Sequence, residues 1–488
     1  MEERQDLFLP FLQPLLDAPR SRYQLRNFYD IERWSPRTYI AERLIPDVEE
    51  SGTQKSPFLI VANLADQQRN DAPSRKKRGW ASHIKALDMA HNVTHNLGFQ
   101  AYGPTRMLMW MGDEEKRAVL PRTVHYRSKV AVAIDSAFHV EEIAGAAPSA
   151  KGAHREDALE LESGKKVALR TEAENTSVPP NRRSEIKDTI MHASDISREW
   201  HAELQVLENG FKNHEFSQVV GGPPGPVPDI GKAGTRAKSK PKNTPEYDRL
   251  RMLRNILRGE NKRIENANRI LQRQEEIDKL DRQAHRERID PQEQSQILEA
   301  LDAKIKDYKD QLASMSTKEV NHMLFLDDDR RAFAMDPPLL MWDRRKAEPL
   351  TVQDDEFYPS QHLALLDFQP RLNITPMTME QSMYFETIAT LLMGAKGTTN
   401  LKHLNTIAPG AYEALVPKVP AIQDPRRGGR RDIDSVRARC LTLEMLRGLA
   451  IAWDKWLFKP DMNDLLTQVG VSHEEQGLMF RKTNRGMT

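Results

Sequence analysis

The sequence predicts an α/β protein whose first 145 residues carry a parallel sheet. Two segments, 58–62 and 107–110, are continuous apolar runs of the kind found in strands that are buried on both faces. Between them, residues 81–97 have a helical pattern that ends at Gly98. Because strand and helix alternate along the chain, we expect parallel strands joined by crossover helices. Residues 113–120 are expected to form a further helix, with an acidic first turn.

The middle of the chain is predicted to be helical around a linker. Helices are expected at 155–172 and 186–211, within a polar extension that spans 146–218. Residues 219–245 open on Gly221-Gly222-Pro223-Pro224-Gly225 and continue with several lysines and arginines, so their composition predicts a disordered basic linker.

Two apolar stripes follow the linker and predict an antiparallel helical hairpin or coiled coil over 246–316. The first stripe repeats every seven residues, and the second alternates spacings of three and four after Asp290-Pro291. The residues are Leu250, Leu257, Ile264 and Leu271, then Leu298, Leu301, Ile305, Tyr308 and Leu312.

Residues 317–488 are predicted to complete the sheet and to form a helical C-terminal region. Short strands are expected at 322–326 and 362–367, and a final helix around 440–457. A helix is predicted over 379–393, because Thr378 and Gln381 have the spacing of a capping box.

Composition narrows the classes of function. A chain of 488 residues with a net charge of +1 is long enough for two or three domains, and any nucleic-acid surface on it must be local. The single cysteine, Cys440, excludes a disulfide framework and a cysteine-rich metal site. The apolar runs are too short to cross a bilayer, and the acidic start at Met1 does not read as a leader peptide.

Few residues have the pattern of a chemical site. Asn63 ends the first predicted strand, where an asparagine either holds a base or simply shapes a turn. His91 and His95 lie four residues apart, as metal ligands on a helix do, but no third ligand is evident in the sequence and we expect no metal site. Neither a GxGxxG nor a GxxxxGK loop is present.

Two basic segments are candidates for contact with nucleic acid. The first precedes Trp80 and consists of Arg75, Lys76, Lys77 and Arg78. Cations beside an aromatic ring suit a phosphate backbone and a stacked base, whereas the alternative is a solvated loop. The segment 425–431 has the same ambiguity. Trp453, Trp456 and Phe458 are expected to pack the last helix.

Several blocks, taken in order, resemble the fungal mitochondrial transcription factor B family, relatives of the rRNA adenine dimethyltransferases. They include Val61-Ala62-Asn63-Leu64, Arg106-Met107-Leu108-Met109-Trp110, Leu120-Pro121-Arg122, Leu339-Leu340-Met341-Trp342-Asp343-Arg344-Arg345 and Glu356-Phe357-Tyr358-Pro359. The last block resembles the Phe-x-Pro motif that follows the catalytic sheet in the dimethyltransferases.

The resemblance implies an incomplete Rossmann-like class I methyltransferase sheet over 1–145, followed by a mainly helical C-terminal region. It implies S-adenosylmethionine as cofactor, with Glu2 at the ribose, Asp30 near the adenine and Asn63 as the catalytic asparagine. It also implies a mitochondrial location.

Two departures from the family argue against efficient methylation. The chain begins at the second strand, so the first strand, its glycine loop and a mitochondrial presequence are expected to belong to a longer protein. Asp66 also stands where an aromatic residue is expected two positions after Leu64, and the stacking that it forgoes is worth on the order of 1–3 kcal/mol.

The sequence therefore predicts a transcription factor that assists the mitochondrial RNA polymerase and binds DNA or RNA. Its contact surfaces are expected at residues 75–80 and in the basic segment 232–263. The alternatives are an S-adenosylmethionine-dependent rRNA adenine N6-methyltransferase and an interaction scaffold built on the hairpin.

Overall fold

The computed structural model describes most of the chain. The described residues are 10, 13–19, 58–65, 82–146, 155, 157–174, 179–182, 195–212, 245–286, 288–357, 362–372, 377–395 and 397–468.

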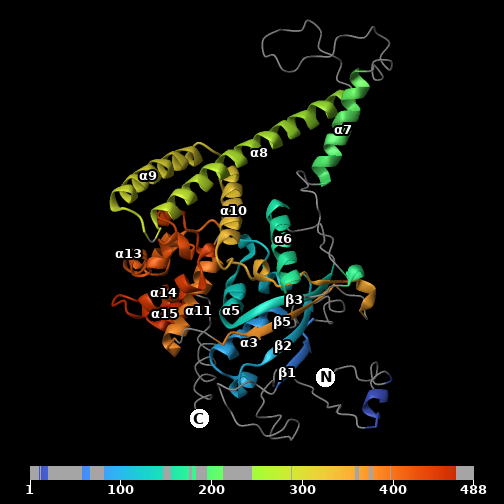
Figure 1. The fold of residues 1–488 in the computed structure, drawn as a ribbon, viewed down its shortest axis with the longest axis vertical. Helices are drawn as coiled ribbons and strands as arrows, with labels where there is room; N and C mark the ends of the chain where they lie inside the picture. Colours follow the sequence, from blue (N-terminus) through green and yellow to red (C-terminus); the bar gives the residue numbers. More distant parts are fainter. Residues whose placement is uncertain are drawn as a thin grey trace.

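A five-stranded sheet built from both halves of the chain lies below the long helix α8 (Pro245–Ala284) in Figure 1, with the strand order β1-β2-β5-β3-β4. Its strands are β1 (Leu59–Asn63), β2 (Arg106–Gly112), β3 (Phe138–Ala146), β4 (Leu350–Val352) and β5 (Leu363–Pro370). β1 pairs parallel with β2 and β3 pairs parallel with β4, whereas β5 lies antiparallel between β2 and β3. The α/β prediction is confirmed, but the sheet is mixed rather than parallel. An apolar pattern predicts which residues are buried and leaves the direction of pairing open.

One face of the sheet is covered by two helices, α3 (Ser82–Thr94) and α5 (Lys129–Ala137). Ala86 and Ala90 let α3 approach closely, and Ile134 of α5 is fully buried beside the central strands. Met109 and Phe368 fill the same core from β2 and β5. These contacts make an apolar layer that holds β1 and β2 in register.

The prediction that β1 is buried on both faces is wrong. Ile60 and Ala62 pack against the α3–α5 layer, whereas Leu59 and Val61 are 58% and 64% exposed. Side chains alternate between the faces of a strand, so the second apolar set points away from that layer. β1 is the last strand of the sheet among the described residues, and no described helix covers its outer face.

A buried polar cluster fastens α6 (Asp157–Ala173) to the turn at Met341–Arg344. Asp343 accepts hydrogen bonds from Arg155 and Ser163, with its oxygens 2.8 and 2.9 Å from their donor atoms. Trp342 lies between two guanidinium groups, those of Arg122 and Arg345, each 3.9 Å from the ring centroid. Segment 339–345, one of the blocks that carry the family resemblance, thus joins α6 to the rest of the fold.

The middle of the chain forms four helices: α7 (Asp195–Lys212), α8 (Pro245–Ala284), α9 (Pro291–Ala313) and α10 (Thr317–Ala334). In Figure 1, α7, α8 and α9 lie above the sheet, and α10 leads down toward it. α8 and α9 pack antiparallel around Ile277, Leu301 and Tyr308, and Arg273 pairs with Asp307. The predicted strand at 322–326 is wrong. It lies inside α10, which a capping box of Ser316 and Glu319 starts.

The C-terminal region is helical, as predicted. Its α-helices are α11 (Met379–Gly394), α12 (Leu404–Ile407), α13 (Ala411–Leu415), α14 (Leu443–Asp454) and α15 (Met462–Gln468). The predicted capping box of Thr378 and Gln381 starts α11. Trp453 of α14 is fully buried in the core that α11 and α14 share. The predicted helix at 113–120 is shorter, since α4 spans Lys116–Val119 after a turn.

In the described part of the chain, every helix is too short or too polar to cross a lipid bilayer.

Candidate functional site

Asn63 lies at the carboxyl end of β1, where open α/β sheets place their ligands. Across the parallel pair it is in register with Trp110, and the Leu64 N–H donates to the Trp110 carbonyl at 2.7 Å. Buried Leu64, 2% exposed, anchors the turn that follows. The Asn63 Oδ1 accepts the Ala65 N–H at 3.0 Å, so the amide shapes the turn while its side chain stays exposed.

Two aromatic rings lie beside this strand end. The rings of Trp110 and Phe357 are 5.3 Å apart and meet edge to face, and both residues are half-buried. Trp110 comes from β2, and Phe357 from the segment between β4 and β5. The sequence pattern predicts the aromatic partner of Asn63 at position 66 and does not predict this pair. Trp110 reaches Asn63 through the parallel pairing of β1 with β2, and Phe357 reaches Trp110 from a distant part of the chain.

The other predicted site residues lie outside the described residues. These are Glu2 and Asp30, expected at the cofactor, and Arg75, Lys76, Lys77, Arg78 and Trp80, expected at nucleic acid. Of the residues expected around S-adenosylmethionine, the structure therefore places Asn63 alone, and its Oδ1 is engaged by the backbone. The described residues do not assemble a cradle for this cofactor.

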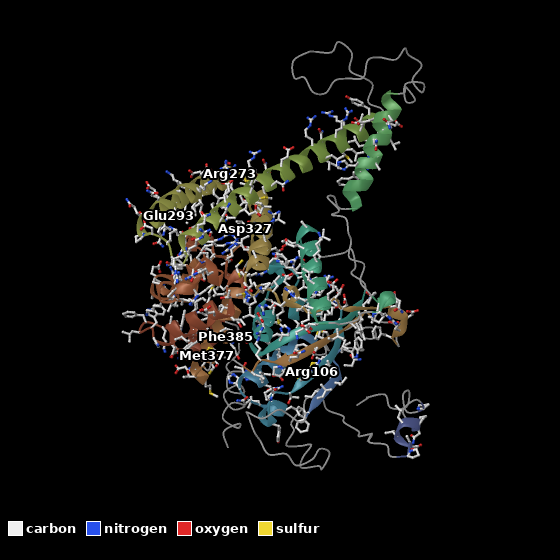
Figure 2. All side chains as sticks on the ribbon, in the orientation of Figure 1. Arg106, Arg273, Glu293, Asp327, Met377 and Phe385 are labelled. Carbon is white, nitrogen blue, oxygen red and sulfur yellow. The ribbon has the colours of Figure 1, made fainter. Side chains whose placement is uncertain are left out.

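The basic segment 425–431 joins the hairpin to the C-terminal region. The Arg430 guanidinium is buried and bonds Asp327 of α10 at 2.9 Å, and it lies 3.4 Å from Asp278 of α8. Asp327 lies beneath α8, facing the C-terminal helices (Figure 2). Arg431 next to it bonds Asp302 of α9 at 2.8 Å. Arg430 is engaged inside the protein, so the solvated-loop interpretation does not describe it, whereas Arg431 is paired but exposed.

The same junction buries the only cysteine. Arg437 pairs with Asp328, and the Cys440 Sγ lies 3.1 Å from that carboxylate. Burial, together with the charge of Asp328, raises the pKa of the Cys440 thiol. Burial also acts to raise the pKa of Asp327, but the charges of Arg430 and Arg437 outweigh it and hold that pKa below its ordinary value. Cys440 is therefore an unreactive core thiol.

α8 presents cations to solvent along its length. Arg249 and Arg254 are engaged by Glu203 and Glu208 of α7. Three further arginines are exposed and form no ion pair with another described residue: Arg251, Arg258 and Arg269. Residues 245–259 thus contribute a helical, partly neutralised surface, while 232–244 lie outside the described residues.

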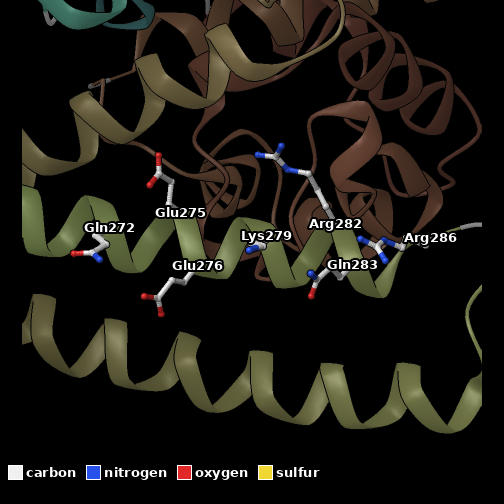
Figure 3. A pocket seen from close by; sticks show the side chains of 7 residues that line it. All are labelled: Gln272, Glu275, Glu276, Lys279, Arg282, Gln283 and Arg286. Atoms are coloured by element: carbon white, nitrogen blue, oxygen red, sulfur yellow. The ribbon is translucent and has the colours of Figure 1, made fainter.

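A groove of about 590 Å³ runs along the C-terminal half of α8 (Figure 3). Its lining residues are Gln272, Glu275, Glu276, Lys279, Arg282, Gln283 and Arg286. Glu276 points toward α9, where it pairs with Lys304, and Arg282 points the other way. A smaller cavity of 260 Å³ against α10 and 425–429 shares Arg282. Such a polar, open groove suits a charged ligand rather than an apolar one.

The aromatic residues near the C-terminus divide into two groups. Trp453 and Trp456 are buried against each other with ring centroids 5.5 Å apart, as predicted. The prediction is wrong for Phe458, which is 81% exposed beside Leu457 at 92%. α14 has ended at Asp454, so these two side chains no longer follow its buried face.

Comparison with known proteins gives no match to any family model, curated protein or solved structure.

Proposed function

We propose that this chain is a nucleic-acid-binding transcription factor for the mitochondrial RNA polymerase, built on a methyltransferase-type sheet. The observation that carries the proposal is the carboxyl end of β1, where Asn63 adjoins the Trp110–Phe357 ring pair. Aromatic faces at a sheet edge offer stacking to bases without strong sequence preference. Because the Asn63 oxygen is engaged in a turn, this edge is better suited to holding a base than to chemistry on it.

The proposal includes a specific fold for the sheet, an incomplete Rossmann-like class I methyltransferase fold. Two features support it. β1, β2 and β3 run in one direction, and α3 and α5, on a single face, connect them in sequence. β5, from much later in the chain, lies antiparallel between β2 and β3, and mixed sheets with one antiparallel strand are common among doubly wound folds.

Affinity is expected to come mainly from phosphate contacts. Arg251, Arg258 and Arg269 are exposed on α8, and the segment 75–80 adds a second basic surface in this proposal. Such contacts position the backbone of DNA or RNA and carry no sequence information. A factor of this kind holds melted promoter DNA for the polymerase.

Binding of a labelled single-stranded oligonucleotide, measured against salt, tests the proposal. The logarithm of the association constant should fall linearly with log salt, with a slope of about −0.7 per phosphate neutralised. Replacing Arg251, Arg258 and Arg269 by Gln should make that slope shallower by about 2. The matched control removes three cations that sit in ion pairs: Lys402, Arg427 and Arg431. An affinity independent of salt would refute the proposal.

A second test addresses the aromatic edge. Trp110→Leu keeps an apolar side chain in the sheet but removes the indole, and should weaken single-strand binding by about 1–3 kcal/mol. Run-off transcription with the mitochondrial RNA polymerase should show stimulation on duplex promoters and little on pre-melted ones. Equal stimulation on both templates would contradict a role in holding melted DNA.

The second candidate function is rRNA adenine N6-methylation, which the position of Asn63 at a carboxyl strand end favours. Transfer of a labelled methyl group from S-adenosylmethionine to small-subunit rRNA distinguishes the two. Turnover that disappears in Asn63→Ala would establish the enzyme, and absence of cofactor binding would favour the factor.

A further inference from the structure

Two helices that are distant in sequence bring three potential metal ligands together. His91 lies in the last turn of α3 and His95 directly follows the helix end, with its N–H bonded to the His91 carbonyl at 3.1 Å, so the two rings lie side by side with centroids 4.3 Å apart. Glu386 of α11 approaches both: its Oε1 is 3.4 Å from His91 Nδ1 and 3.7 Å from His95 Nε2. One donor atom from each residue lies within 4.8 Å of the other two. The third ligand that the sequence did not reveal is thus supplied by α11.

The burial of these groups points to a ligand between them. The His95 side chain is 7% exposed, and its Nε2 is buried without a hydrogen-bond partner in the described part of the chain. Buried polar atoms are almost always paired, so this nitrogen calls for a partner. The side chains of His91 and Glu386 are each 40% exposed, which leaves the cluster open to solvent on one side.

The spacing of the donors fits a tetrahedral ion. Zinc binds imidazole nitrogen and carboxylate oxygen at about 2.0–2.1 Å, which places neighbouring donors about 3.3 Å apart. The separations from Glu386 Oε1 to His91 Nδ1 and His95 Nε2, 3.4 and 3.7 Å, need only small side-chain adjustments to reach that value.

Hydrogen bonds alone account for this geometry less well. His91 Nδ1 lies 3.4 Å from Glu386 Oε1, but 3.7 Å is too long for a hydrogen bond between His95 Nε2 and that oxygen. An ion shared by the three donors would give the buried His95 Nε2 a partner.

We propose that His91, His95 and Glu386 bind one divalent transition-metal ion, with Zn²⁺ as the expected metal. The ion would join α3, which covers the sheet, to α11, which starts the C-terminal helical region. Three protein ligands leave a fourth position for water on the exposed side. The proposal is independent of the proposed function, because neither Asn63 nor the α8 surface takes part in it.

Zinc titration of the full-length protein, first stripped by a chelator, tests this site. Wild type should bind one Zn²⁺ that Glu386→Gln and His91→Ala lose, with affinity falling at least about 100-fold, since even outer-shell changes cost about 10–100-fold. His139→Ala is the matched control, because His139 pairs with Glu141 at 3.0 Å without a third ligand. Co²⁺ in place of Zn²⁺ should give the visible absorption of a tetrahedral site, and this absorption should be absent in Glu386→Gln.

Thermal unfolding supplies a second readout that does not depend on the spectrum. Zn²⁺ should raise the melting temperature of wild type and of His139→Ala, and should leave Glu386→Gln unchanged. If wild type and Glu386→Gln bind zinc with equal affinity, or wild type binds none at micromolar concentration, the proposal is wrong. Circular dichroism of each variant before titration ensures that lost binding reflects a lost ligand.

Discussion

Arg430 and Arg431 are adjacent cations that each pair with an aspartate, and they differ in burial. Arg430 is 3% exposed and bonds Asp327, which is 4% exposed. The side chains of Arg431 and Asp302 are 39% and 56% exposed. Replacing each arginine by alanine therefore compares a buried and an exposed ion pair within one short segment.

The expected magnitudes differ several-fold. Removing one partner of a buried pair costs about 3–5 kcal/mol, because the other charge is left uncompensated. Asp327 keeps Arg437 at 3.3 Å, so Arg430→Ala should lie at the lower end of that range, at about 3 kcal/mol. Arg431→Ala should cost about 0–1 kcal/mol, since water screens its pair.

Urea unfolding followed by circular dichroism measures both changes, and hydrogen exchange shows where they act. Arg430→Ala should loosen the amides of α8 and α10, which Asp278 and Asp327 anchor. The double variant Arg430→Met with Asp327→Leu should recover most of the lost stability, because the buried Asp327 charge is removed together with Arg430 while Arg437 keeps Asp328. A loss below 1 kcal/mol for Arg430→Ala, or equal losses for both single variants, would refute this reasoning.

Three further changes test the packing and the buried charges. Burial raises the pKa of Asp329 to about 7 from the ordinary 3.8, so the folded state holds an extra proton between about pH 4 and 7, and stability should fall as pH rises through that window. Asp329→Asn can still accept a hydrogen bond from the Val124 N–H. In urea titrations the variant's stability should depend less on pH and should exceed that of wild type by up to about 4 kcal/mol at pH 8. An unchanged dependence on pH would contradict the raised pKa. Gly429→Ala places a Cβ 2.4 Å from the Ala421 carbonyl oxygen and should lower stability by about 1–3 kcal/mol, whereas an unchanged melting temperature would mean that the backbone shifts freely. Leu301→Ala opens the fully buried hairpin core and should cost about 2–5 kcal/mol in chemical unfolding, unless α8 and α9 contribute little to the cooperative unit.

Local patterns predicted local structure well. The Thr378–Gln381 capping box starts α11, and the seven-residue spacing of Leu250, Leu257 and Leu271 places each of them, 3% exposed, on the buried side of α8. Periodicity and capping act within one or two helical turns, so they leave a direct trace in the sequence. The strand at 322–326 shows the limit, because a short apolar run fits a helix as well as a strand.

The α/β class, the helices of the hairpin and of the C-terminal region, and the place of Asn63 at a strand end can all be predicted from the residues alone. The antiparallel pairing of β5, the outward orientation of Leu59 and Val61, and the burial of the Arg430–Asp327 pair become known only from the folded chain. Glu386 lies 295 residues beyond His91 in the chain, and Phe357 meets Trp110 from another strand connection. These contacts between distant residues arise when helices and strands pack together, and the spacing of residues within one segment does not predict them.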